Sequence, residues 1–224
     1  MAQRLRVFSS SVGTKLLIGL TGLLLFLYLI THIAGNLMVF AGRDTFNGYS
    51  HMLLSNPAIP VIEVGLLAIF LVHVYKTVTM YLGNRAARPV KYQQKKTAGS
   101  PSRKTFSSTT MIVSGLWLLA FIVAHVKQFK YGAEYEAPGS GVRDLYRLEM
   151  ENFSDPILVA FYVLSMLVVG SHLWHGISSA TQSLGVNQPR WTPRILAAGK
   201  FFAILITGVF IIIALWAHFV GARS

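Results

Sequence analysis

Residues 16–40 read LLIGLTGLLLFLYLITHIAGNLMVF, with no Asp, Glu, Lys or Arg among them. An α-helix rises about 1.5 Å per residue, so a stretch of this length crosses the roughly 30 Å hydrocarbon core of a bilayer. Four more long apolar stretches follow, at residues 58–82, 109–126, 156–184 and 195–220. Because they take up most of the 224 residues, we expect residues 1–224 to form one all-α integral membrane domain, a bundle of five transmembrane helices.

The charged residues gather in the links between these stretches. The net charge is +12, from 20 Lys and Arg against 8 Asp and Glu. Fourteen basic residues cluster before the first stretch, after the second, and around the link from the fourth to the fifth: Arg4, Arg6, Lys15, Lys76, Arg85, Arg88, Lys91, Lys95, Lys96, Arg103, Lys104, Arg190, Arg194 and Lys200. By the positive-inside rule, this pattern predicts a cytoplasmic N-terminus and an external C-terminus. Membrane lipid, and not nucleic acid, is the partner that this placement indicates.

The links differ in character. Residues 41–57 carry turn signals and are expected to be short and polar, and residues 83–108 form the most basic link and are expected to be irregular. The third link, 127–155, is the longest and most acidic, and its residues 141–152 are expected to form a short surface helix. The fourth, 185–193, contains two prolines and is expected to be a tight turn.

Each of the first four apolar stretches contains at least one histidine, and the first ones are His32, His73, His125 and His172. An imidazole in lipid is costly unless a partner satisfies it. The first and third stretches run outward, which puts His32 about 25 Å from the inner surface and His125 near the outer end. The second and fourth run inward, which puts His73 and His172 about 24 Å from the outer surface. Depth therefore pairs His32 with His125 in the outer half, and His73 with His172 in the inner half.

Two pairs of histidines at two depths predict the axial ligands of two haem irons. Since both axial positions would be filled, such haems favour electron transfer over oxygen binding. The chain has no cysteine, which excludes thioether-linked haem, an iron–sulfur cluster within this chain and any disulfide. The haems would therefore be two haems b, held non-covalently. His175, three residues after His172, competes for the inner site.

The first and third stretches also share a short pattern. Thr21-Gly22 precedes His32, and Ser114-Gly115 precedes His125, with ten residues from glycine to histidine in both. A glycine at a fixed distance from each histidine lets a flat macrocycle or a neighbouring helix approach closely. Ordinary helix packing at both glycines explains the pattern equally well.

With these motifs in place, the chain resembles a known family over nearly its whole length. The similarity lies in LLLFLYLITHIAGN (23–36), GLLAIFLVHVYKTVTMYLGNRAARP (65–89), MIVSGLWLLAFIVAH (111–125) and HLWHGISSATQSLG (172–185). These segments resemble the five-helix, di-haem cytochrome b subunit of succinate:quinone oxidoreductases, which are the succinate dehydrogenases and fumarate reductases. In that family a glycine follows the inner ligand by four residues, and another follows nine further on. Gly176 and Gly185 match this spacing and favour His172 over His175.

The resemblance implies a role in respiratory complex II and the tricarboxylic acid cycle. It implies a multi-pass membrane anchor in the inner (plasma) membrane of a prokaryotic cell, passing electrons between an iron–sulfur subunit and menaquinone or another quinone. A flavoprotein with FAD would oxidise succinate or reduce fumarate, and the iron–sulfur subunit would dock on the cytoplasmic face, against the N-terminus and the basic second link. The ligands implied for the outer haem fall on His32 and His125, and those for the inner haem on His73 and His172.

The resemblance also suggests where quinone and propionates would lie. Quinone chemistry in di-haem relatives takes place near the outer haem, and the candidates at that level are Asn36, His51 and Glu63, the last as a carboxyl that exchanges protons. Lys76, one turn past His73, is a candidate partner for the inner haem's propionates, with Lys127 and Arg43 as outer counterparts. Some fumarate-reducing relatives carry an acid two residues before the inner ligand, whereas this chain has Gly170.

Other functions remain open at the level of sequence. A cytochrome b subunit of another quinone-linked dehydrogenase or hydrogenase would use the same histidines. A haem-free membrane anchor or transporter would leave four intramembrane histidines unexplained. Zinc and di-iron sites need carboxylates or closely spaced ligands, and a proton pump needs a chain of buried acids, so these classes fit less well. His218, at the end of the fifth stretch, is expected to be an interfacial residue.

Overall fold

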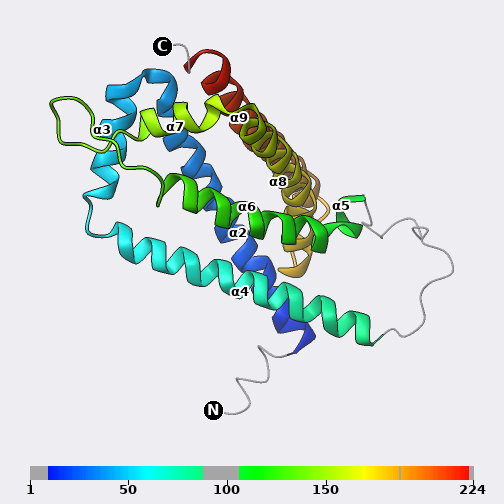
Figure 1. Cartoon of the computed structure of the whole chain (residues 1–224). Helices are drawn as coiled ribbons and strands as arrows, with labels where there is room; N and C mark the ends of the chain where they lie inside the picture. Colours follow the sequence, from blue (N-terminus) through cyan, green and yellow to red (C-terminus); the bar gives the residue numbers. More distant parts are fainter. Residues whose placement is uncertain (1–9, 88–105, 187, 222–224) are drawn as a thin grey trace.

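The computed structural model describes residues 10–87, 106–186 and 188–221 (Figure 1), and all regular elements within these ranges are helices. In this described part of the chain, five helices are long and apolar enough to cross a membrane: α2 (Ser11–Asn36), α4 (Ile59–Ala86), α6 (Met111–Phe129), α8 (Pro156–Ser183) and α9 (Thr192–Phe219). The shorter elements are η1 (Leu37–Ala41), α3 (Arg43–Leu54), α5 (Phe106–Thr109) and α7 (Leu145–Ser154). By length and composition, this is a membrane-embedded, multi-pass protein.

Local sequence signals explain where the long helices begin. Ser10 caps α2, because its side chain accepts a hydrogen bond of 3.0 Å from the Gly13 N–H. Asp155 caps α8 in the same way through the Ile157 N–H at 2.9 Å, and Pro156 occupies the first turn. The first helix therefore starts at Ser11, five residues before the apolar stretch itself.

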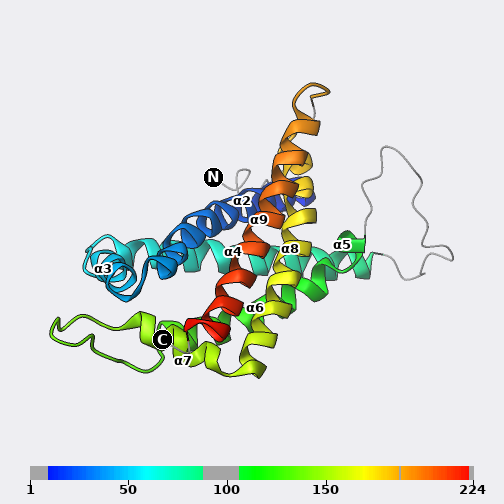
Figure 2. The ribbon, with the colours of Figure 1, turned by 90° about the horizontal axis from the view of Figure 1, so that it is seen from above.

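Four of the long helices form a closed ring. Each packs against the next in the order α2, α4, α6, α8 and back to α2. The two diagonal pairs, α2 with α6 and α4 with α8, hardly touch. Helix α9 packs on α8, as Figures 1 and 2 both show, and less extensively on α2. The interior of this four-helix ring is thus reached from all four histidine-bearing helices.

Glycines bring α8 and α9 unusually close. A Cβ on Gly170 would stand 2.4 Å from Thr207 Oγ1, and one on Gly199 would stand 2.4 Å from Ile177 Cγ2. Small residues at helix contacts in membranes allow such close backbone approach. Dispersion contacts along this seam hold α9 to the ring.

The external end, as the sequence orients it, is closed by the two short helices α3 and α7. The link at residues 41–57, expected to be short and polar, contains a helix, Arg43–Leu54, in spite of its turn signals. The Asn47 amide donates to Asp144 Oδ1 at 2.7 Å, and Asn47 Oδ1 accepts from the Tyr146 N–H at 3.0 Å. The turn-forming residues of this link thus serve as helix-to-helix contacts. The short helix expected within 141–152 forms as α7, which begins directly after its N-cap Asp144 and ends two residues beyond the expected range.

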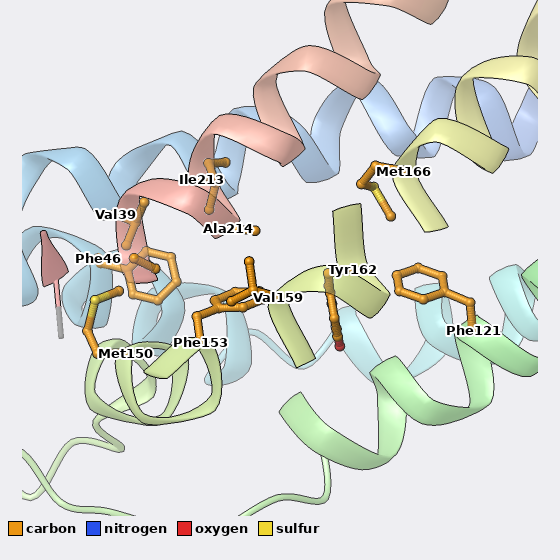
Figure 3. Close-up of a cluster of buried hydrophobic side chains, with 11 residues drawn as sticks. Val39, Phe46, Phe121, Met150, Phe153, Val159, Tyr162, Met166, Ile213 and Ala214 are labelled. Carbon is orange, nitrogen blue, oxygen red and sulfur yellow. The ribbon is translucent and has the colours of Figure 1, made fainter. Parts of the chain in front are cut away.

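The main hydrophobic core lies beneath these short helices. Figure 3 shows its members converging from η1, α3, α6, α7, α8 and α9. They are Val39, Phe46, Phe121, Met150, Phe153, Val159, Tyr162, Met166, Ile213, Ala214 and Ala217. In contrast, α4 has no buried residue along its whole length. Among the five long helices, α4 is therefore the least buried.

Several predictions concern residues outside the described ranges. They include most of the basic second link, namely Arg88, Lys91, Lys95, Lys96, Arg103 and Lys104, and the N-terminal Arg4 and Arg6.

Candidate functional site

The outer pair of histidines meets across one diagonal of the ring. His32 of α2 and His125 of α6 have ring centres 5.9 Å apart, with ring planes at 90° to each other. Two imidazoles that bind one metal ion from opposite sides, each through a nitrogen about 2 Å away, have centres roughly 6 Å apart. The spacing therefore fits two axial ligands of a single iron.

Aromatic rings surround this outer pair. Tyr28 stacks on His32 at 5.4 Å, and Phe210 of α9 lies 5.7 Å from the same ring. Phe121 and Phe129, one turn to either side of His125, lie 5.6 and 5.3 Å from it. These rings offer apolar contacts, which suit a flat apolar ligand better than small hydrated ions, since such ions need oxygen ligands.

The inner pair lies across the other diagonal. His73 belongs to α4 and His172 to α8, the two helices on that diagonal. His73 Nδ1 lies 3.0 Å from Thr21 Oγ1 of α2, and His172 Nδ1 lies 3.0 Å from Ser114 Oγ of α6. His172 is the histidine that meets Ser114, whereas His175 has no corresponding contact among the described residues.

The repeated Thr-Gly and Ser-Gly doublets lie where these inner histidines meet the neighbouring helices. A Cβ on Gly22 would stand 3.2 Å from His73 Cε1, and one on Gly115 would stand 3.7 Å from His172 Cε1. Each doublet thus receives the imidazole of the next long helix, which passes close to the helix backbone. The similarity between the first and third stretches therefore corresponds to a repeated contact between helices.

The outer site has a comparable contact through a tyrosine. His125 Nδ1 lies 3.3 Å from the Tyr162 hydroxyl of α8, and Tyr162 O–H donates to Gln128 Oε1 at 2.6 Å. Gln128 also lines a cavity of about 510 Å³ at the end of α6, together with Lys127, Tyr131 and Asn152. The outer histidine is thereby linked, through two side chains, to a cavity beside α7.

The candidate quinone residues occupy different environments. Glu63 forms an ion pair with Lys130 of α6, and it interacts electrostatically with Tyr28, the residue stacked on His32. Asn36 donates to the His32 carbonyl at 2.8 Å within the same helix. His51 is exposed on α3. Of the three, Asn36 is bonded to the backbone of His32 itself, whereas Glu63 is paired with Lys130.

The three candidate partners for haem propionates lie in different parts of the structure. Lys76 Nζ lies 5.9 Å from the Tyr75 ring, one turn from His73. Lys127 is an exposed residue in the wall of the cavity. Arg43 belongs to the α3–α7 contact, with its Nε 3.7 Å from Asp144 Oδ2.

Two further positions have structural explanations. His218 Nδ1 donates to the Phe153 carbonyl at 2.8 Å, which fastens the end of α9 to α7. At Gly170, any side chain would collide with Thr207 of α9. The close α8–α9 seam therefore accounts for the glycine.

Sequence reasoning missed the partners of the imidazole nitrogens and one buried acid. Thr21 and Ser114 could have been found from their place immediately before the two matched glycines. No local signal marks Tyr162, Gln128 or Glu149. Glu149 of α7 is only 4% exposed, and burial raises the pKa of its carboxyl to about 8.

Comparison with known proteins identifies no family or function: no family model, curated protein or solved structure matches this chain.

Within the described ranges, no three or more His, Cys, Asp or Glu residues form a group suited to a metal ion. A haem iron needs only two protein ligands, because the macrocycle supplies the other four nitrogens. The candidate site therefore rests on the two histidine pairs themselves.

Proposed function

We propose that this chain is the membrane anchor and electron-transfer subunit of a succinate:quinone oxidoreductase, holding one haem b between His32 and His125 and a second between His73 and His172. The observation that carries the proposal is the placement of the two pairs on the two diagonals of one four-helix ring. Helix bundles bind cofactors in this way, between side chains on facing helices.

The ligand chemistry favours haem over a bare metal ion. A structural zinc site needs four protein ligands and a catalytic one three, whereas each site here offers two imidazoles. The diagonal helices hardly touch, so the two histidines of each pair come from helices that do not pack on each other. When bound, haem supplies one-electron transfer with both axial positions occupied.

The proposed roles of the two histidine pairs differ with their depth in the membrane. In the proposed orientation, with a cytoplasmic N-terminus, the inner pair receives electrons from an iron–sulfur subunit, and the outer pair lies near the quinone. The two levels differ by roughly 15–20 Å along the membrane normal. Glu63, beside Lys130 and near Tyr28, would exchange the protons that accompany quinone chemistry.

The choice of succinate and of a flavoprotein partner with FAD rests on the sequence motifs that resemble the family. Isolation of the tagged chain from its native membranes tests this choice. We expect an iron–sulfur protein and an FAD-containing protein to co-purify, with succinate-dependent reduction of a menaquinone analogue. A different dehydrogenase or a hydrogenase in the preparation would replace the succinate assignment and leave the cytochrome b assignment in place.

Haem binding is tested by the dithionite-reduced minus oxidised spectrum of the purified complex, with pyridine haemochrome quantification. We expect two haems b per chain. Alanine at any one of His32, His73, His125 and His172 should remove one haem or convert it to a high-spin form. His175→Ala, three residues from His172 on the same helix, is the matched control and should keep both haems. A preparation without haem would favour the anchor or transporter function.

A further inference from the structure

Three hydroxyl groups beside the histidines each donate their hydrogen to an acceptor other than the histidine. Thr21 Oγ1 donates to the Leu17 carbonyl at 2.6 Å, and Ser114 Oγ donates to the Met111 carbonyl at 3.0 Å. Tyr162 O–H donates to Gln128 Oε1 at 2.6 Å. A hydroxyl has one hydrogen and two acceptor lone pairs, so each oxygen can only accept from the imidazole beside it.

The direction of these hydrogen bonds fixes the tautomers of three histidines. Since the hydroxyl oxygens accept, Nδ1 of His73, His172 and His125 must carry the hydrogen. A neutral imidazole has a hydrogen on one nitrogen only, so Nε2 keeps a free lone pair. All three rings are therefore prepared to bind a metal through Nε2.

The fourth histidine is held differently. Within the described ranges no hydroxyl hydrogen-bonds to the His32 ring, which is positioned by stacking on Tyr28. The inner site therefore has two hydrogen-bonded imidazoles and the outer site has one.

We propose, building on the function proposed above, that Thr21, Ser114 and Tyr162 are positioning residues, which set the tautomer, the ring rotation and the donor strength of three axial histidines. An acceptor on the far nitrogen raises the basicity of a metal-bound imidazole. A more basic ligand stabilises ferric over ferrous iron and so lowers the reduction potential. Thr21 and Ser114 act on the inner haem, and Tyr162 acts on the outer haem.

Gln128 extends this arrangement at the outer site. Because it takes the Tyr162 hydrogen, it keeps the tyrosine oxygen in the accepting role. Without Gln128, Tyr162 O–H is free to donate to His125 Nδ1, which would leave the hydrogen on Nε2 and oppose ligation. Gln128 thus acts on the outer haem through two hydrogen bonds.

Matched pairs of variants separate this role from packing. Thr21→Val and Ser114→Ala remove the hydroxyls, whereas Thr21→Ser and Ser114→Thr keep them. Tyr162→Phe and Gln128→Leu address the outer site. The measurements are haem content, potentiometric titration of each haem, and the low-spin electron paramagnetic resonance signals of the purified complex.

We expect Thr21→Val and Ser114→Ala to raise the potential of the inner haem alone, by a severalfold to tenfold change in the ferric-to-ferrous preference, where tenfold is about 59 mV for one electron. Tyr162→Phe should do the same to the outer haem alone. Gln128→Leu should lower the content of outer haem. Thr21→Ser and Ser114→Thr should match the wild type.

Two results would overturn the inference and are distinct from each other. If the wild type carries two haems, but loss of the hydroxyls leaves potentials and spectra unchanged, the positioning role is wrong and the proposed function stands. If Thr21→Ser or Ser114→Thr shifts the potential as far as the hydroxyl-free variant, the role is packing. A wild type without haem would instead remove the proposed function. The three hydroxyls are tested separately, so one variant that fails to insert still leaves two readouts.

Discussion

Gly22 of α2 lies directly against the imidazole of His73 of α4, and a Cβ at position 22 would stand 3.2 Å from His73 Cε1. The matching contact, from Gly115 of α6 to His172 of α8, is 3.7 Å. The same glycine-to-histidine contact thus occurs twice, and the contact at Gly22 leaves less room for a side chain than the contact at Gly115.

We expect Gly22→Ala to disturb the inner site more than Gly115→Ala. The contact at 3.2 Å requires the His73 ring to move, whereas 3.7 Å is an ordinary van der Waals distance. Crowding of this kind costs about 1–3 kcal/mol. Inner haem content and the melting temperature in detergent are the measurements. Equal effects of the two substitutions would contradict the expectation.

Gly170→Ala should destabilise the α8–α9 seam by about 1–3 kcal/mol, because its Cβ would collide with Thr207 Oγ1. Thr207 Oγ1 is itself buried without a hydrogen-bond partner in the described part of the chain. Thr207→Ala should therefore restore the stability of the Gly170→Ala variant. Thr207→Val, which keeps both γ atoms, is the control and should not. Thermal unfolding in detergent distinguishes the two double variants.

Asn47→Ala should loosen the contact between α3 and α7 by about 1–3 kcal/mol, since it removes one of the hydrogen bonds to the buried Asp144 carboxylate and the acceptor of the Tyr146 N–H. Proteolysis at the outer end should speed up, as a readout of local opening. Glu151→Gln, in the exposed ion pair with Arg147, is the control and should change little. No difference in cleavage rate would argue against the contact.

Glu149 should make stability fall as pH rises. Burial raises the pKa of its carboxyl from 4.5 to about 8, so between these values the folded chain holds a proton that the unfolded chain releases. The stability of the folded state therefore decreases through this window, by up to about 1.4 kcal/mol per pH unit. Glu149→Gln should abolish this slope in thermal melts from pH 5 to pH 8.

Glu151, on the same helix, supplies the control with the opposite sign. Hydrogen bonds from Tyr135 and Arg147 lower the pKa of its carboxyl, so its contribution is present above the ordinary value and is lost as pH falls. Glu151→Gln should leave the slope between pH 5 and pH 8 in place. A wild type with no slope in that window would contradict the role of Glu149.

Much of the arrangement could be predicted from residues 16–40 and their counterparts, because hydropathy fixes which segments enter a bilayer and the helical rise fixes depth. The depths of the four histidines pair His32 with His125, whose ring centres lie 5.9 Å apart in the structure, and His73 with His172. Whether they ligate iron stays a prediction. The helix at Arg43–Leu54 was not predictable from its turn-forming residues, since Asn47 is satisfied by α7, which lies about a hundred positions away in the chain.

The sequence by itself determined the five apolar spans, the acidic and basic links and the depth of each histidine, because these properties depend on composition and on the regular rise of a helix. Only the tertiary structure decided which helices lie on the diagonals of the ring, and which hydroxyls meet which imidazoles. The physical reason is rotation about the helix axis. Each residue turns by about 100°, so small differences in helix packing change which side chains face one another, while their depth stays the same.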